Sequence, residues 1–103
     1  MRLPERFSYL FWDCDLSLLD SHEHSSFVLS RLMFRMEEFV TAWLRQTYPS
    51  DMLLAYLHND GARKLGPREL DYWCATLGVD ESLRHQWRTA AEARVRAEVI
   101  PPA

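Results

Sequence analysis

Apolar residues recur along the chain at the spacing of amphipathic helices. A helix is expected from about residue 22 to 35, because Val28, Leu32 and Met36 stand at positions i, i+4 and i+8 and so share one helix face. A second is expected over residues 37–47, where acidic residues at the start favour the positive end of the helix dipole. Three more are expected over residues 50–59, over 66–77 and from 80 onward. No stretch alternates apolar and polar residues over the length of a strand, so the pattern predicts an all-α protein.

Glycine, proline and capping residues predict where these helices begin and end. Asn59-Asp60-Gly61 predicts a stop, because these residues tolerate the left-handed conformation that ends helices. A loop over residues 62–65 is expected to follow. Gly66-Pro67 then begins the next helix and Gly78 ends it. Asp80 is expected to cap the last helix.

The two ends of the chain depart from the helical pattern. Residues 1–20 are rich in aromatic residues and irregular, with a short helical turn expected after Pro4. Residues 97–103, which include two prolines, are expected to fray. We therefore expect a single domain over residues 1–103, built as a compact bundle of about five helices.

Composition restricts the setting in which the protein works. Of its 103 residues, 48% are apolar and 13% aromatic, which indicates a folded core rather than disorder. The longest apolar runs have three residues, too short to cross a membrane, and no apolar stretch follows the first charged residues as a secretory signal requires. Cys14 and Cys74 are too few for a disulfide framework and are expected to be small buried side chains. A cytoplasmic location is expected.

Catalysis finds little support in the residue pattern. Asp13 and Asp15 could form a carboxylate pair for a divalent metal, but enzymes that use such a pair place it on a strand after a glycine-rich loop, which this chain lacks. His22 and His24 are spaced i, i+2, whereas zinc sites on helices use i, i+4. The carboxylates are expected to cap turns, and His24 to pack against or hydrogen-bond the aromatic N-terminal segment. We expect no enzyme activity, no metal and no cofactor.

DNA binding is the alternative function. The helices around Gly78 imitate a helix-turn-helix over residues 66–96. The nucleic-acid-binding candidates of this hairpin are Arg84, Arg88 and Arg94. The acidic residues that open the second helix would repel phosphates, and the net charge of −3 with a pI of 5.7 is unlike that of a general nucleic-acid binder. This alternative includes binding as a homodimer.

The aromatic residues indicate a protein-binding surface. Four Trp, four Tyr and five Phe exceed the needs of a core this size, and Trp, Tyr and Arg dominate interface hot spots. Burial in the core is the competing interpretation for each aromatic residue. The partner-binding candidates are Phe11, Trp12, Tyr72, Trp87 and Arg31.

Several short motifs between residues 7 and 80 resemble a family of small uncharacterised bacterial helical proteins. Members of that family are often encoded beside nucleotidyltransferase toxins of the abortive-infection type, so the resemblance implies an antitoxin-like protein that masks a toxin. The sequence departs from the family pattern at Met36-Glu37-Glu38, where a Gly is usual, and Arg63-Lys64 matches loosely. The motifs are Leu10-Phe11-Trp12-Asp13-Cys14-Asp15, Leu19-Asp20, His24, Val28 to Leu32, Trp43-Leu44, Tyr48, Leu65 to Leu70, Trp73 and Leu77-Gly78.

The resemblance transfers no catalytic residue, and its signature residues can define the fold alone. It implies that Trp12 and Trp73 belong to the core and that Asp13 and Asp20 are caps. Arg31 is then expected to pair with a carboxylate, either Asp13 or Asp15.

Overall fold

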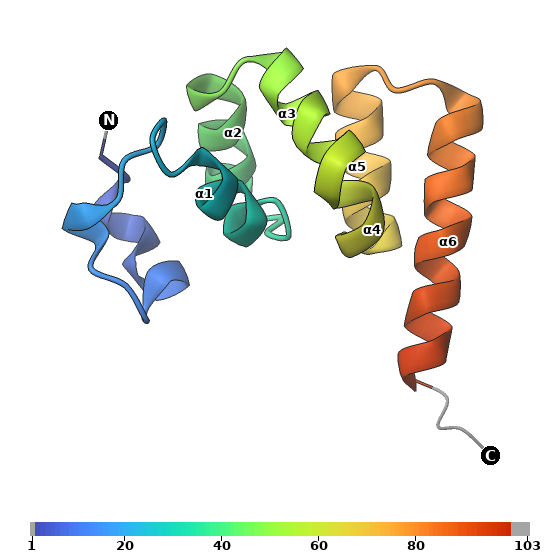
Figure 1. Cartoon of the computed structure of the whole chain (residues 1–103), viewed down its shortest axis with the longest axis horizontal. Coiled ribbons are helices and arrows are strands. Elements are labelled where there is room, and N and C mark those ends of the chain that lie inside the picture. Colours follow the sequence, from blue (N-terminus) through green and yellow to red (C-terminus); the bar gives the residue numbers. More distant parts are fainter. Residues whose placement is uncertain (1, 100–103) are drawn as a thin grey trace. The chain divides into compact units, whose positions relative to one another are not determined.

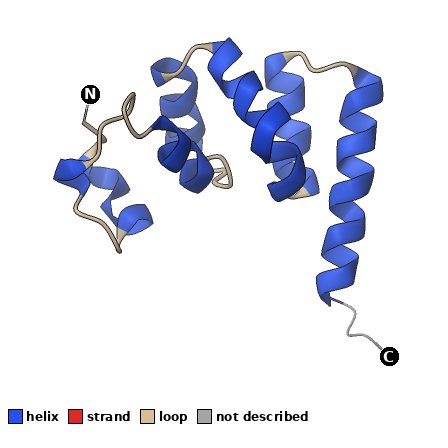
Figure 2. Cartoon of the chain, viewed as in Figure 1, coloured by secondary structure: helices blue, strands red, loops and turns tan. Residues whose placement is uncertain are grey.

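The structure, a computed structural model, describes residues 2–99, and its regular elements are helices throughout (Figures 1 and 2). Within that range the extended backbone pairing is confined to one isolated bridge between Arg2 and Asp20. The predicted all-α class is therefore confirmed. None of the described helices is long and apolar enough to cross a lipid bilayer. The contacts within the chain divide it into two compact units, and the division falls between Thr47 and Tyr48.

Unit 1 (residues 2–47) holds two 3-10 helices followed by two α-helices. They are η1 (Glu5–Phe11), η2 (Leu16–Leu18), α1 (Ser25–Leu32) and α2 (Glu38–Thr47). The turn expected after Pro4 is η1, which begins there because the proline ring fixes the N-cap φ at −60°. Phe7 of η1 is fully buried and meets Trp43 of α2 edge-on, with 5.2 Å between ring centroids. The irregular N-terminal segment is thereby part of the core of unit 1.

Helix α1 is shorter than the helix predicted over residues 22–35. At its start the Asp20 carboxylate accepts hydrogen bonds from the backbone N–H groups of His22 and Glu23, both at 2.9 Å. The Asp20 N–H in turn donates to Nδ1 of His24 at 3.0 Å. These bonds hold residues 20–24 in a turn, because a side chain that satisfies backbone donors competes with the helix. Asp20 is thus a cap, and His24 bonds the N-terminal segment, as predicted.

Unit 2 (residues 48–99) contains the remaining helices. They are α3 (Ser50–Tyr56), the π-helical segment η3 (Leu57–Gly61), α4 (Ala62–Lys64), α5 (Pro67–Leu77) and α6 (Glu81–Val99). Trp73 on α5 is fully buried, which confirms that it is a core residue. Helix α6 packs on α4 and α5. It remains helical over residues 97–99, where fraying was predicted, and residues 100–103 lie outside the described part.

The predicted stop at residues 59–61 and the predicted loop at 62–65 are wrong. Gly61 has a helical φ of −58°, and the chain continues through η3 into α4. A Cβ built on Gly61 would lie 2.9 Å from Cδ2 of Leu57 and 3.3 Å from Cδ1 of Leu65. Both leucines are fully buried. Glycine is needed here for close packing, whereas the prediction assumed that it was needed for a left-handed turn.

The hairpin between α5 and α6 has the boundaries that its residues predict. Gly78 is left-handed, with a φ of 72°, and its N–H donates to the carbonyl of Cys74. This is the usual role of glycine after a helix. The Asp80 carboxylate accepts from the N–H of Ser82 at 3.1 Å and so caps α6.

Candidate protein-binding surface

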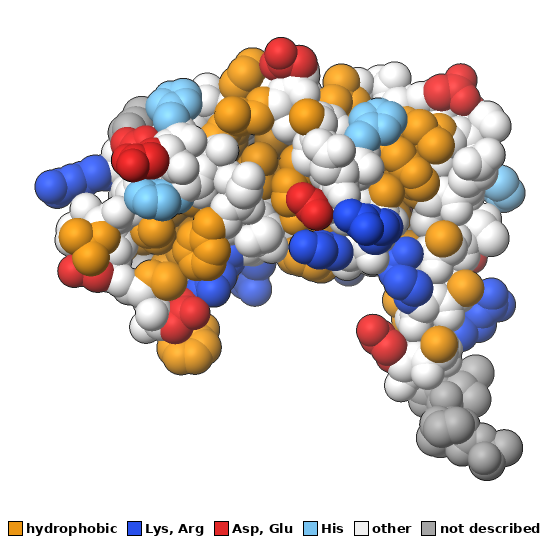
Figure 3. All heavy atoms as spheres, viewed as in Figure 1, with side chains coloured by type: hydrophobic (Ala, Val, Ile, Leu, Met, Phe, Trp, Pro, Cys, Tyr) orange, Lys and Arg blue, Asp and Glu red, His pale blue; other side chains and the backbone are white. Residues whose placement is uncertain are grey.

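Unit 1 exposes large aromatic side chains that its core leaves uncovered. Trp12 is 81% exposed, Tyr9 51% and Phe27 37%. Arg31 contacts Phe27 and the residues on either side of Trp12, and Arg35 contacts Tyr9. We call Trp12, Tyr9, Phe27, Arg31 and Arg35 the aromatic surface. Phe34 and Leu18 are further exposed apolar residues of this unit. In the space-filling view, hydrophobic side chains are exposed over the N-terminal elements with cationic side chains beside them (Figure 3).

Arg31 of α1 ties the chain around Trp12 to the helix. Its guanidinium donates to both carboxylate oxygens of Asp13 and, at 3.3 Å, to the carbonyl oxygen of Leu10. It also lies over the rings of Phe11 and Phe27, 5.5 and 4.9 Å from their centroids. The Arg31 hydrogen bonds lower the pKa of Asp13 to about 2, so the pair is fully charged at neutral pH. Of the two carboxylates proposed as partners of Arg31, Asp13 is therefore the one that pairs with it.

A second ion pair holds Tyr9. The Nε and Nη2 atoms of Arg35 donate to Glu37 at 3.1 and 2.6 Å, and the Tyr9 hydroxyl donates to Oε2 of Glu37 at 3.1 Å. The Arg35 guanidinium lies 6.0 Å from the Tyr9 ring centroid. The hydrogen bonds from Arg35 lower the pKa of Glu37. Both arginines of the aromatic surface are thus neutralised within unit 1.

Two predictions about the N-terminal aromatic residues need correction. Phe11, a partner-binding candidate, is only 1% exposed, because its ring packs on Phe27, 6.0 Å away, beneath the Arg31 guanidinium. It belongs to the core of unit 1. Trp12, which the resemblance places in the core, is instead the most exposed of the large hydrophobic residues described. Its place as a partner-binding candidate is consistent with that exposure.

The other two aromatic candidates lie in unit 2 and are half-buried. Tyr72 meets Trp73 edge-on at 4.9 Å, and Trp87 meets His58 edge-on at 5.1 Å. Part of each ring is therefore in contact with unit 2 itself, and the role of these two residues in binding stays a prediction.

The three arginines proposed for DNA binding are all engaged within unit 2. Arg84 pairs with Asp71 at 3.3 Å, and Arg88 contacts Asp71 at 3.2 Å and Glu92 at 3.0 Å. Arg94 donates to the carbonyl oxygen of Leu65 at 2.9 Å. The carboxylates that surround Arg84 and Arg88 reduce the positive potential that a phosphate would meet.

Asp13, Asp15 and His24, which were weighed for metal binding, have structural partners. Asp15 caps η2 by accepting from the N–H and hydroxyl of Ser17, at 3.0 and 2.6 Å. No three His, Cys, Asp or Glu side chains in residues 2–99 are grouped to hold a metal ion. Cys74 is buried as expected, but Cys14 is partly exposed and its thiol donates to Asp13 at 3.4 Å. Partial desolvation and this hydrogen bond raise the pKa of Cys14, which disfavours the nucleophilic thiolate.

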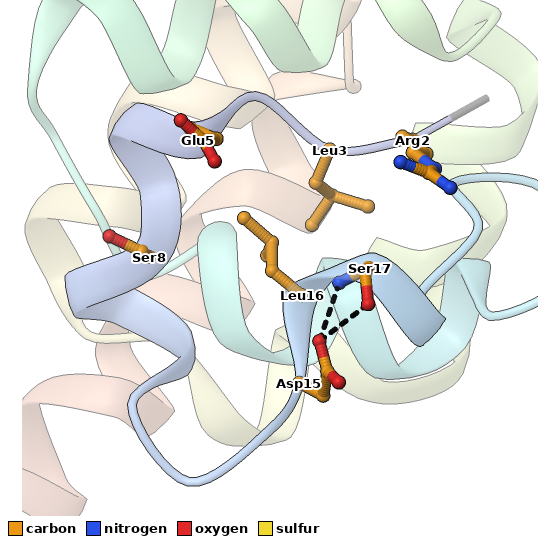
Figure 4. A pocket seen from close by; sticks show the side chains of 7 residues that line it. All are labelled: Arg2, Leu3, Glu5, Ser8, Asp15, Leu16 and Ser17. Carbon is orange, nitrogen blue, oxygen red and sulfur yellow. Dashed lines mark hydrogen bonds between the residues drawn. The ribbon is translucent and has the colours of Figure 1, made fainter.

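A pocket of about 380 Å³ opens beside η1 and η2 (Figure 4). The side chains of Leu3 and Leu16 point toward each other across it, and Asp15 lies at its edge with its two bonds to Ser17. Its rim carries both acidic and basic groups, and sequence reasoning did not predict it. The lining residues are Arg2, Leu3, Glu5, Ser8, Asp15, Leu16 and Ser17.

Sequence reasoning also missed Tyr9 and Phe27 as exposed aromatic residues. A signal was present in the helix over residues 22–35, which is apolar on two faces. Val28 and Leu32 form the buried face, whereas Phe27 and Phe34, at i and i+7, form a second, exposed one. A helix with two such faces has more apolar surface than a small core can cover.

Comparisons with known proteins place the chain in no group: no family model, no curated protein and no solved structure matches it.

Proposed function

We propose that this protein is a non-enzymatic binding module that docks a partner protein on the aromatic surface of unit 1, with Trp12 as the anchor. The observation that carries the proposal is the 81% exposure of Trp12 on a segment whose neighbours are held in place. Exposing an indole to water is unfavourable, whereas Trp is the residue most enriched at binding hot spots. A partner that buries this indole would recover that free energy.

The charges of the surface indicate what the partner presents. Arg31 and Arg35 are already paired with Asp13 and Glu37, so an acidic patch on the partner would gain little from them. The partner site that fits is an apolar pocket for the indole, with a polar rim. We therefore expect an affinity that depends weakly on salt, because screening acts mainly on unpaired charges.

The resemblance described above suggests which protein this partner is. Within the proposal, the module is antitoxin-like and masks a nucleotidyltransferase-type toxin in the cytoplasm. DNA binding through Arg84, Arg88 and Arg94, with the protein as a monomer or a homodimer, remains the alternative, and the experiment distinguishes DNA from a protein partner. The ion pairs of Arg84 and Arg88 speak against DNA as the primary ligand.

The experiment compares three forms of the tagged full chain in the cells that produce it: wild type, Trp12→Ala and Leu18→Ala. Leu18 is the matched control, because it is 74% exposed and apolar but lies outside the aromatic surface. We expect wild type and Leu18→Ala to capture the same nucleotidyltransferase-type protein, and Trp12→Ala to lose it. With the purified partner, calorimetry should show about 30-fold weaker binding for Trp12→Ala, as for a hot-spot residue.

Two results would contradict the proposal. Equal binding by wild type and Trp12→Ala would reject Trp12 as the anchor. Capture of DNA alone, with an affinity that falls steeply with salt and is lost in Arg84→Ala/Arg88→Ala, would favour the DNA-binding alternative.

A further inference from the structure

One guanidinium binds the chain on both sides of Trp12. Arg31 donates to the carbonyl oxygen of Leu10, two residues before the indole, and to the carboxylate of Asp13, the residue directly after it. The turn is closed from within by a backbone bond of 2.9 Å from the N–H of Cys14 to the carbonyl of Phe11. Arg31 itself is held by its position on α1 and by the two rings that it covers.

We infer that Arg31 is a positioning residue, which fixes the turn at residues 10–14 and so presents Trp12 in one orientation for its partner. That the orientation serves partner binding rests on the proposed function. That Arg31 fixes the turn concerns the free protein alone. An exposed side chain on a mobile segment loses conformational freedom when it binds, and a pre-ordered segment avoids much of this loss. Arg31 thus acts on affinity through Trp12, whether or not it touches the partner.

Arginine suits this task for reasons that lysine does not share. The planar fork of the guanidinium can bond both oxygens of Asp13 and still donate to Leu10, while its flat face covers Phe11 and Phe27. A lysine ammonium is a point charge and cannot satisfy these partners together. We therefore expect Arg31→Lys to retain the positive charge and yet fail to restore the orientation of Trp12.

Arg35 provides a matched control within the same surface. It lies four residues further along, is also half-buried and also pairs with a carboxylate, but it holds Tyr9 through Glu37. Arg35→Met removes an equivalent ion pair without touching the turn at residues 10–14. A specific effect of Arg31 on Trp12 should therefore be absent from Arg35→Met.

The test uses the full chain labelled with fluorotryptophan and observed by fluorine NMR without any partner. Four resonances are expected for the four Trp, and Trp12→Phe identifies the one from Trp12. In wild type we expect the Trp12 resonance to be broader than that of free fluorotryptophan, because the turn that carries the indole is ordered. In Arg31→Met, Arg31→Lys and Asp13→Asn it should sharpen and shift toward free fluorotryptophan, and in Arg35→Met it should not.

An unchanged Trp12 resonance in both Arg31→Met and Asp13→Asn would overturn the inference. If Arg31→Met also moves the resonances of Trp43 and Trp73, the variant is globally perturbed and Asp13→Asn decides, because Asp13 is exposed. With a purified partner, Arg31→Met should bind about tenfold more weakly than wild type. Trp12→Ala could bind the partner as wild type does while Arg31→Met still sharpens the Trp12 resonance. The proposed function would then fail, and the positioning of the turn by Arg31 would stand.

Discussion

Trp12 and Trp73 show how one residue type takes opposite roles in this chain. Trp73 lies on α5 and is fully buried, whereas Trp12 follows η1 and is 81% exposed. The resemblance implies burial for both, and only Trp73 follows it. Burial depends on which elements pack together, and the position of Trp12 at the end of a 3-10 helix turns its side chain away from the core that Phe7 and Phe11 fill.

The two tryptophans therefore predict opposite mutational effects on stability. Trp12→Ala should change the free energy of unfolding by less than about 0.5 kcal/mol, as for a surface substitution. Trp73→Ala should reduce it by about 3–5 kcal/mol, because it removes a large buried side chain and leaves a cavity. Urea unfolding followed by circular dichroism measures both. A strong loss of stability in Trp12→Ala would contradict its exposed position.

The Arg31–Asp13 pair predicts a pH dependence in acid. The pKa of Asp13 is about 2 in the folded protein against an ordinary value of 3.8, so the unfolded chain binds its proton at a higher pH. The stabilisation is therefore complete above about pH 4 and is lost as the pH falls toward 2. Asp13→Asn should show a shallower loss of the free energy of unfolding over this range. Some slope remains, because the pKa of Glu37 is also lowered.

A substitution of Arg31, the partner of Asp13, is the control for this pH effect. Arg31→Met should flatten the profile as Asp13→Asn does, and the double variant should resemble either single one, because all three remove the same interaction. Additive effects in the double variant would show that the two residues act independently.

At the scale of the element, the segment Leu57–Gly61 explains why one boundary was mispredicted. Its composition favours a stop, and local propensity alone would end α3 there. The chain remains helical because Leu57 and Leu65 are fully buried and pack where Gly61 has no side chain. Tertiary packing outweighs local propensity here, and the backbone of the segment is π-helical. At Gly78 a Cβ would meet nothing within 4 Å, so the left-handed φ alone favours glycine and the boundary was predicted correctly.

Gly61→Ala tests this explanation. Alanine favours a helix over glycine by about 1 kcal/mol, but its Cβ would lie 2.9 Å from Leu57, and overpacking costs about 1–3 kcal/mol. We expect a net loss of about 1 kcal/mol in the free energy of unfolding. In a Leu57→Ala background the same substitution should be less destabilising, because the 2.9 Å contact is removed and the 3.3 Å contact with Leu65 remains beside the helix preference. A stabilising effect of Gly61→Ala in both backgrounds would contradict close packing at this glycine.

At the scale of the whole molecule, helical periodicity was enough to predict the class and most helices, because it depends on residues close in the sequence. The site was only partly predictable, since it depends on contacts across unit 1. Trp12 was identified from residue type, and the pairing of Arg31 with a carboxylate from the resemblance. Tyr9 and Phe27 were missed, and Phe11 was misplaced, because the sequence does not reveal which rings pack on one another and which the arginines cover. The long-range pair of Arg31 and Asp13 joins residues 18 positions apart.

The central claim is that unit 1 binds a partner protein through Trp12. The most direct measurement replaces Trp12 with a photo-cross-linking phenylalanine analogue in the full chain, with the same replacement at Leu18 as the control. On irradiation in the native cells, we expect position 12 to yield one adduct with a nucleotidyltransferase-type protein. Excess wild-type protein should suppress this adduct, whereas Trp12→Ala protein should not, and position 18 should give little. No protein adduct at position 12, or equal adducts at positions 12 and 18, would contradict the account.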